Sequence, residues 1–292
     1  MPVLWSTLAA LVMVTAVPAV PVPAAPDVVS VASDADQRLT VAVNIGTQGP
    51  FRFLVDTGAQ NTVLADGVVG RLGMAPSSRR PVTGVAGTLL VETVSLDDIH
   101  VGKRIFSEPV VPLLRTDVIR ADGILGIDAL QGQRVLLDFE HNLLSIGDGR
   151  DDHEADGNEI VVTAHRRQGQ LIVTHARIDG IDTDVVIDTG TETSIGNLAL
   201  RHRLTHYSAF GATRLIGVTG QEIDAELSTT GTLSVDHLTL ANMQIAFVDS
   251  PAFVALHLDR RPALLLGMRE LRAMRRVVID FAHRRVTFNV AN

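Results

Sequence analysis

Two stretches of the sequence share one pattern: FLVDTGAQNTVL from Phe53 to Leu64, and VVIDTGTETSIG from Val185 to Gly196. In each, three apolar residues lead into Asp-Thr-Gly, so a buried strand is predicted to end at an aspartate. The Thr hydroxyl can bond the neighbouring backbone, and the Gly permits a tight bend that brings its N–H near the carboxylate. One copy alone is typical of an ordinary β-turn, because Asp and Gly both favour turns. The second copy indicates an internal repeat.

The two halves of the chain repeat beyond these stretches. The number of residues that separate Asp56 from Asp188 is close to the number that separate Asp138 from Asp280. The small difference corresponds to modest insertions in the second half. Three further pairs of segments keep their order in both halves: VTGVAGT (82–88) and LIGVTGQ (215–221), ILG (124–126) and LLG (265–267), and LLDFEHNLLSI (136–146) and VIDFAHRRVTF (278–288). A shared order at nearly constant spacing indicates a duplicated unit rather than a chance pair of tripeptides.

The repeated unit is predicted to be mostly β. Short runs rich in Val, Ile, Leu and Thr alternate with turns that contain Gly, Asp and Pro. Helical spacing is limited to NLALRHRLTHY (197–207) and to short segments after Gly126 and Gly267. The sequence therefore predicts an all-β fold of two lobes related by a pseudo-twofold axis, with a cleft between them. The lobes are expected at residues 26–147 and 160–292, joined by an acidic, exposed linker at 148–159.

Composition and charge exclude several classes of function. The chain has 292 residues, enough for two domains with their own cores, and its 46% hydrophobic and 20% charged residues are typical of globular proteins. The net charge of −8 argues against a nucleic-acid partner, which needs a basic surface. No cysteine is present, so disulfides, thiolate metal sites and cysteine nucleophiles are excluded.

The N-terminal residues indicate an export signal. The apolar run LAALVMVTAV (8–17) precedes an Ala/Pro-rich stretch, and VPA (22–24) has the small residues of a cleavage site. Residues 1–25 are therefore expected to be a signal peptide, which would place the protein in the periplasm or outside the cell. An uncleaved anchor and a buried strand or helix remain alternatives, because no Lys or Arg precedes the run. Membrane contact is expected only through this segment, since no other stretch approaches ~20 apolar residues.

A twofold repeat of the Asp-Thr-Gly loop would bring Asp56 and Asp188 together. Two carboxylates at that separation cannot both ionise easily, so they are expected to share one proton at neutral or mildly acid pH. The ionised carboxylate could then activate a water held between them, while the protonated one donates to a carbonyl oxygen. Such a pair hydrolyses an amide without a metal or a covalent intermediate, so neither a cofactor nor a metal is expected.

These motifs resemble the aspartic proteases of the retropepsin type. The resemblance rests on DTGA (56–59), GVAG (84–87) and ILG (124–126), and on their counterparts DTGT (188–191), GVTG (217–220) and LLG (265–267). It covers both lobes and implies an aspartic endopeptidase that binds a peptide or protein substrate in extended conformation between them. Because both halves carry a glycine-rich flap, the chain resembles two fused retropepsin subunits, and it is expected to be active as a monomer.

The resemblance also implies roles for individual residues. Asp56 and Asp188 would be the catalytic pair. Thr57 and Thr189 would interlock the two active-site loops, which are completed by Gly58, Ala59, Gly190 and Thr191. The substrate-binding flaps would be formed by Gly84, Val85, Ala86 and Gly87 in the first half, and by Gly217, Val218, Thr219 and Gly220 in the second.

The two active-site loops differ at one position, where Ala59 in the first half corresponds to Thr191 in the second. A hydroxyl can donate to a carboxylate and lower its pKa, whereas alanine cannot. We therefore expect Asp188 to be the more easily ionised aspartate and the general base.

Other patterns have ordinary structural explanations. His202 and His206 are spaced for one helix face, but the glutamate of an HExxH motif is missing, so solvated side chains are expected rather than a metal site. The linker residues Asp152, Glu154 and Asp156 lack the closing glutamate of a Ca²⁺ loop. Two functions other than catalysis remain open: a catalytically silent peptide-binding module of the same fold, and a structural β-domain that only carries the signature.

Overall fold

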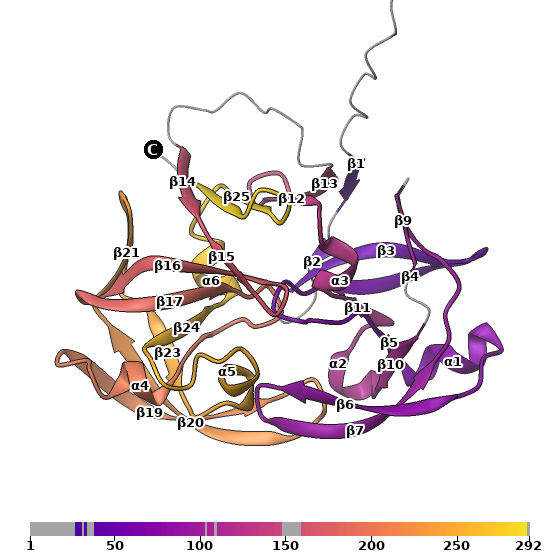
Figure 1. The fold of residues 1–292 in the computed structure, drawn as a ribbon, viewed down its shortest axis with the longest axis horizontal. Helices are drawn as coiled ribbons and strands as arrows, with labels where there is room; N and C mark the ends of the chain where they lie inside the picture. The colour runs from indigo at the N-terminus through magenta and orange to yellow at the C-terminus, as the bar shows by residue number, and fades with distance from the viewer. Residues whose placement is uncertain are drawn as a thin grey trace, which may run out of the picture.

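The computed structural model describes residues 27–30, 32–33, 38–102, 104–107, 110–147 and 159–290. The predicted signal peptide (1–25) lies outside these residues, as does the predicted linker except for Glu159, which begins strand β14. The described residues are mostly β and form two sheet bodies joined by a third sheet (Figure 1). The prediction of an all-β, two-lobed fold is therefore confirmed.

The first lobe is built on ten strands within the described residues, in the order β6-β7-β10-β5-β11-β4-β3-β8-β9, with β2 paired to β3 beside that path. The strands are β2 (Ala32–Ser33), β3 (Leu39–Ile45), β4 (Gln48–Val55), β5 (Val63–Ala65), β6 (Ser78–Gly84), β7 (Gly87–Val94), β8 (Ile99–Val101), β9 (Arg104–Phe106), β10 (Val111–Leu114) and β11 (Gly123–Leu125). Its helices are short: α1 (Asp66–Leu72), α2 (Thr116–Ile119) and α3 (Ile127–Leu130). β3 alternates buried and exposed residues over most of its length, as expected for a strand with one face on the core.

The second lobe repeats this sheet strand for strand, in the order β19-β20-β23-β18-β24-β17-β16-β21-β22, with β15 paired to β16. The strands are β15 (His165–Arg167), β16 (Gln170–Ile178), β17 (Ile181–Ile187), β18 (Ser194–Gly196), β19 (Tyr207–Ile216), β20 (Glu222–Thr230), β21 (Thr232–Val235), β22 (Leu238–Ala241), β23 (Gln244–Phe247) and β24 (Ala263–Leu266). Its helices are α4 (Leu198–Arg201), α5 (Pro251–Ala255) and α6 (Met268–Leu271). The matching order is the structural form of the sequence repeat.

Helix α4 is shorter than the helical spacing of residues 197–207 predicts. It begins where the Asn197 side chain accepts a hydrogen bond from the backbone N–H of Leu200. The chain then leaves the helix, because Tyr207 starts β19 and pairs with Thr230 of β20. Pairing in the sheet therefore overrides the local helical pattern.

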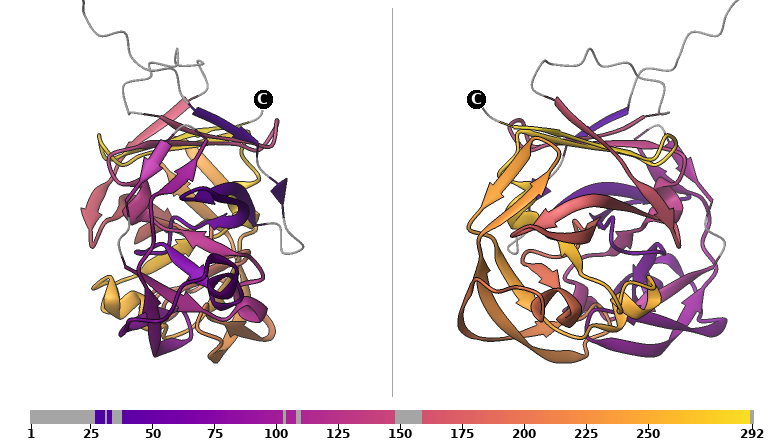
Figure 2. Two further views of the ribbon diagram at one scale, coloured as in Figure 1. Left: turned by 90° about the vertical axis from the view of Figure 1, so that its right-hand side faces the viewer. Right: turned by 60° about the vertical axis from the view of Figure 1, so that its left-hand side comes forward.

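A six-stranded sheet joins the lobes, in the order β1-β13-β12-β25-β26-β14. Its strands are β1 (Asp27–Ser30), β12 (Arg134–Asp138), β13 (Leu143–Gly147), β14 (Glu159–Thr163), β25 (Arg276–Asp280) and β26 (Arg285–Asn289). At its centre β12 and β25 run antiparallel with Leu136 opposite Val278, so the pseudo-twofold axis passes between these two strands. This sheet lies across one end of the molecule, and the β6–β7 and β19–β20 hairpins lie at the other (Figures 1 and 2).

The apolar strands that lead into the Asp-Thr-Gly loops are part of the core. Phe53, Val55 and Ile187 are almost fully buried. Burial of each such side chain stabilises the folded state by roughly 1.5–3 kcal/mol relative to leaving it exposed. The strand that precedes each aspartate is therefore firmly packed. No helix among the described residues has the length and apolar character needed to cross a bilayer.

Candidate active site

Each aspartate follows the last residue of a buried strand and is held there by the apolar-apolar-Gly segment of its own half. The Asp56 N–H donates to Leu125 O at 3.1 Å, beside the parallel pairing of β4 with β11. The Asp188 N–H donates to Leu266 O at 3.0 Å, beside the parallel pairing of β17 with β24. The same local construction therefore occurs once in each lobe.

The structure brings the two aspartates together. Asp56 is 7% exposed and Asp188 is 4% exposed. A Cβ atom added to Gly58 would lie 2.5 Å from Asp188 Oδ1, and one added to Gly190 would lie 2.3 Å from Asp56 Oδ2. Each loop therefore passes directly against the carboxylate of the other half, and only glycine leaves room for it. We refer to Asp56 and Asp188 as the aspartate pair.

Backbone N–H groups fix both carboxylates. Asp56 Oδ1 accepts hydrogen bonds from the N–H groups of Gly58 and Ala59 at 2.8 and 2.9 Å. Asp188 Oδ1 accepts one from the N–H of Gly190 at 2.9 Å. Because these bonds occupy one oxygen of each carboxylate, they set the direction in which the other oxygen points.

Thr57 and Thr189 join the two loops by a reciprocal set of four hydrogen bonds. The Thr57 N–H donates to Thr189 Oγ1 at 3.0 Å, and the Thr189 N–H donates to Thr57 Oγ1 at 3.2 Å. Each hydroxyl then donates across the lobe boundary, from Thr57 to Ile187 O at 2.8 Å and from Thr189 to Val55 O at 2.7 Å. Both threonines are fully buried, so these bonds are shielded from water and hold the aspartate pair in register.

A second pair of side-chain contacts supports the loops, and the sequence reasoning above did not predict it. Thr62 Oγ1 donates to Asp128 Oδ1 at 2.7 Å and accepts from the Gly126 N–H at 3.2 Å. In the second lobe the Ser194 hydroxyl donates to Glu270 and accepts from the Gly267 N–H at 3.0 Å. Thr62 and Ser194 occupy equivalent positions after the two aspartates, so an alignment of the two halves could have identified them.

One difference between the lobes lies upstream of the aspartates, where Arg38 in the first half corresponds to Gln170 in the second. The Gln170 side chain is buried and donates to Gly58 O at 2.8 Å. Arg38 lines the cavity above the aspartate pair and donates to Ile119 O at 3.2 Å. Among the described residues that line the cavity, the positive charge therefore lies on the side of Arg38.

The environment raises the pKa of both aspartates. Burial, together with the negative charge of Asp56, raises the pKa of Asp188 to about 8. Hydrogen bonds from the N–H groups of Gly190 and Thr191 lower this pKa and only partly offset the rise. Burial also raises the pKa of Asp56, but the N–H groups of Gly58 and Ala59 and the positive charge of Arg38 oppose this shift. Below about pH 8 the pair therefore retains a proton, as two adjacent carboxylates should.

The expected contribution of the Thr191 hydroxyl is wrong. Thr191 Oγ1 is buried and makes no hydrogen bond within the part of the chain that the structure describes. The backbone N–H of Thr191, rather than its hydroxyl, acts on the carboxylate. The positive charge of Arg38 acts instead on Asp56, where it opposes the rise in pKa that burial causes.

Two hairpins cover the aspartate pair. Flap 1 is the β6–β7 hairpin with its tip at residues 84–87, and flap 2 is the β19–β20 hairpin with its tip at residues 217–220. The tips touch, since a Cβ on Gly84 would lie 3.3 Å from Val218 Cγ2 and one on Gly217 would lie 3.2 Å from the Ala86 nitrogen. In Figure 1 both flaps run along the lower edge and meet near its middle.

A cavity of about 290 Å³ lies between the flaps and the aspartate pair. Four of the eight predicted flap residues line it: Gly84, Val85, Gly217 and Val218. The lobes contribute apolar side chains from both sides, including Leu54, Leu114, Ile124, Val186 and Leu265. The charged residues among its lining are Arg38, Asp56 and Asp188, so the aspartate pair is set in largely apolar surroundings.

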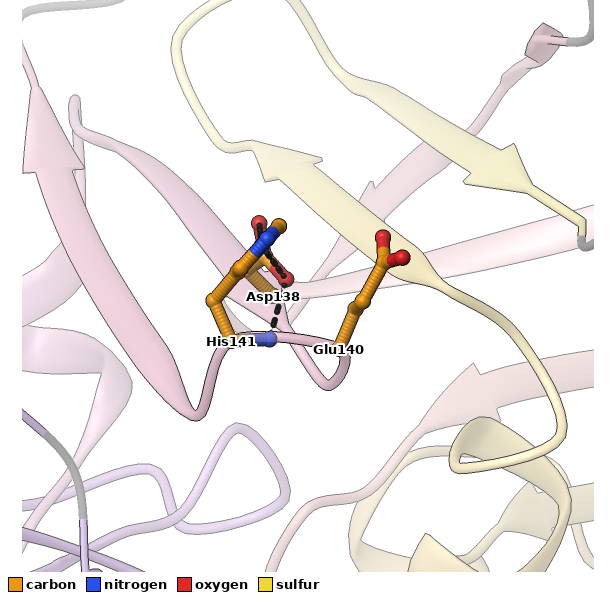
Figure 3. Close-up of side chains that lie close together, drawn as sticks. All are labelled: Asp138, Glu140 and His141. Atoms are coloured by element: carbon orange, nitrogen blue, oxygen red, sulfur yellow. Dashed lines mark hydrogen bonds and ion pairs between the residues drawn. The ribbon is translucent and has the colours of Figure 1, made fainter.

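One further cluster of ligand-type side chains lies on the six-stranded sheet, where Asp138, Glu140 and His141 have atoms within 4.8 Å of one another (Figure 3). The Asp138 carboxylate accepts from the His141 N–H at 2.9 Å and from Arg276 Nε at 2.8 Å, and Glu140 is paired with Arg275. The same Asp–His turn recurs in the second half, where Asp280 accepts from the His283 N–H at 2.8 Å. The cluster is thus explained as a repeated hairpin turn, and its two arginines disfavour a cation.

Comparison with known proteins agrees with this geometry. The family model described as aspartyl protease matches the chain in two regions, residues 39–129 and 174–269. The first region runs from β3 to α3 and the second from β16 to α6, so each match falls on one lobe and contains one Asp-Thr-Gly loop. In a comparison with curated proteins the chain finds no match.

Proposed function

The chain belongs to the aspartyl protease family, and we propose that it is an endopeptidase that hydrolyses peptide bonds with a water activated between Asp56 and Asp188. The observation that carries this proposal is the reciprocal approach of the two loops, in which Gly58 lies against Asp188 and Gly190 lies against Asp56. This arrangement places two buried carboxylates together under a covered cavity, which is what shared-proton chemistry requires.

The proposed reaction follows from the unequal surroundings of the pair. Asp56, beside Arg38, is the ionised member and takes a proton from the attacking water. Asp188 retains its proton and donates it to the carbonyl oxygen of the scissile bond, where negative charge develops. The proton held by Asp56 then passes to the leaving nitrogen and the C–N bond breaks, while one hydroxyl of the tetrahedral intermediate returns its proton to Asp188 as the carboxylic acid forms.

The substrate is proposed to be a peptide or protein segment in extended conformation. The flap strands form the roof of the cavity, and an extended chain can pair with strand backbone by β-augmentation. Apolar side chains line both walls of the cavity, which favours hydrophobic residues on either side of the scissile bond. Each lobe contributes one aspartate and one flap, so we propose that a single chain suffices for activity.

The location of the protein is proposed on different grounds. The apolar run at residues 8–17 and the small residues that follow it favour export to the periplasm or beyond the cell. The total absence of cysteine is compatible with either side of the membrane.

Digestion of an unbiased peptide library tests the proposed function. The chain is expected to cleave library peptides from acid to neutral pH, and Asp56→Asn is expected to abolish cleavage while it leaves the circular dichroism spectrum unchanged. Peptide binding without cleavage at every pH, by folded protein, would instead identify a silent peptide-binding module. Neither binding nor cleavage would identify a structural β-domain.

The pH dependence of cleavage is a separate prediction. Activity requires one proton on the aspartate pair, and the pKa of Asp188 is raised to about 8. We therefore expect kcat/KM to fall about tenfold per pH unit above pH 8, and to fall on the acid side only once Asp56 is also protonated. The measurement is a kcat/KM profile from pH 3 to 10, with thermal unfolding followed at each pH as the control. A constant kcat/KM up to pH 10 in folded protein would contradict the proton-sharing pair.

A further inference from the structure

The tip of flap 1 is held by a side chain of the opposite lobe. Ser250 precedes helix α5 of the second lobe, and its hydroxyl donates to Val85 O, at the tip of flap 1, over 2.6 Å. The two residues are far apart in the chain, and Ser250 is 2% exposed. A part-buried hydrogen bond between the lobes therefore fixes the position of Val85, a residue that lines the cavity.

Apolar packing accompanies this hydrogen bond. The Val85 side chain packs against a buried cluster that belongs to the second lobe and includes Phe253 and Leu256 of the α5 region. Contacts between α5 and both strands of flap 1 extend the junction, and Figure 1 shows α5 beside the end of this hairpin. The end of flap 1 thus crosses the cleft and rests on the lobe that carries Asp188.

Flap 2 meets the first lobe in a different way. The short helix in the corresponding place is α2, and a Cβ on Gly220 at the tip of flap 2 would lie 3.2 Å from Val118 of that helix. The residue before α2 is Arg115, whose side chain pairs with Asp117 and makes no cap to the helix. The contact of Ser250 with flap 1 is therefore specific to one half of the molecule, and the residue before α2 makes no equivalent helix cap.

We propose that Ser250 is a positioning residue for peptide cleavage, which holds flap 1 closed over the aspartate pair. This inference rests on the proposed endopeptidase function. The hydroxyl also accepts from the Ala252 N–H at 3.2 Å, so Ser250 couples the start of α5 to the flap tip. A substrate bound beneath the flap depends on that closed position, whereas the chemistry at Asp56 and Asp188 does not involve the serine.

Hydrogen exchange tests the contact without any need for catalysis. In Ser250→Ala the amides of the flap 1 tip are expected to exchange about three- to tenfold faster, which is the effect of losing one net hydrogen bond. Ser250→Thr keeps the hydroxyl and is expected to retain the wild-type rate, and Arg115→Ala is the matched control at the other helix. Unchanged exchange at residues 84–87 in Ser250→Ala overturns the proposal, and so does an equal increase throughout residues 251–258, because the serine would then act only on α5.

Kinetics on a cleaved library peptide provide the second readout. Ser250→Ala is expected to raise KM about three- to tenfold with kcat within about twofold, and Ser250→Thr is expected to restore KM. A KM equal to that of the wild type, in a variant whose flap 1 exchanges faster, overturns the positioning role. If the wild type cleaves no peptide while exchange at flap 1 responds as described, the proposed function fails and the flap contact stands.

Discussion

Asp188→Asn is expected to lower kcat/KM for peptide cleavage by about 10³-fold and, above pH 8, to make the protein more stable than the wild type. The loss of activity follows because asparagine cannot deliver a proton to the carbonyl oxygen, and general acid–base catalysis contributes about 10²–10⁴-fold. The gain in stability follows from the same raised pKa. One substitution should therefore separate what the carboxyl does for catalysis from what it does to the fold.

The direction of the stability effect depends on which state binds the proton more tightly. The pKa of Asp188 is raised from 3.8 to about 8 in the folded protein, so the folded state holds the proton more tightly than the unfolded state. The stabilisation from protonated Asp188 is complete below pH 3.8 and is lost as pH rises through about 8. An asparagine never ionises, so we expect Asp188→Asn to raise the free energy of unfolding by several kcal/mol at pH 8.5 and to change it little at pH 4.

Urea unfolding at pH 4 and pH 8.5 measures this effect. Asp182→Asn is the matched control, because Asp182 lies on the same strand, β17, with its side chain 79% exposed. The control removes only an exposed ion pair with Arg177, so it should change the free energy of unfolding by less than about 1 kcal/mol at both pH values. If Asp188→Asn changed stability equally at pH 4 and pH 8.5, proton sharing between the two aspartates would be refuted.

The repeat made much of this site predictable from sequence. The sequence contains three features in the same order in both halves: an Asp-Thr-Gly loop, a glycine-rich flap and an apolar-apolar-Gly segment. A twofold arrangement of the halves then places Asp56 against Asp188. The same comparison could have found Thr62 and Ser194, which share the offset of the aspartates. These features depend on local turn chemistry and on the symmetry of the repeat, and both can be recognised from the sequence.

Features that break the symmetry could not be predicted in the same way. Ala59 and Thr191 differ in sequence, but it is the backbone N–H of Thr191 that acts on the carboxylate, and the hydroxyl makes no hydrogen bond among the described residues. The charge that distinguishes the two aspartates comes instead from Arg38, which approaches the cavity from the start of β3. The contact of Ser250 with Val85 likewise lies outside the repeat, and only the packing of the lobes reveals it.

Gly58→Ala and Gly190→Ala are each expected to lower kcat/KM by about 10²-fold or more, although neither change touches an aspartate. A methyl group on Gly190 would lie 2.3 Å from Asp56 Oδ2 and 2.4 Å from its Cγ, far inside contact distance. The carboxylate cannot move aside without losing its hydrogen bonds from the N–H groups of Gly58 and Ala59. Displacement of a reacting group by about 1 Å can cost about 10²-fold in rate.

The reciprocal geometry makes this prediction specific. Gly58→Ala places its methyl group 2.5 Å from Asp188 Oδ1, so the two variants should lose comparable activity by acting on opposite members of the pair. Gly70→Ala is the matched control, because no atom lies within 4 Å of a Cβ at Gly70 in helix α1, where alanine is the better helix former. Initial rates on one cleaved peptide measure all three variants, with circular dichroism to establish folding. Full activity in Gly190→Ala would mean that the loops do not pass against the carboxylates, and a loss in Gly70→Ala equal to that in Gly58→Ala would remove the steric argument.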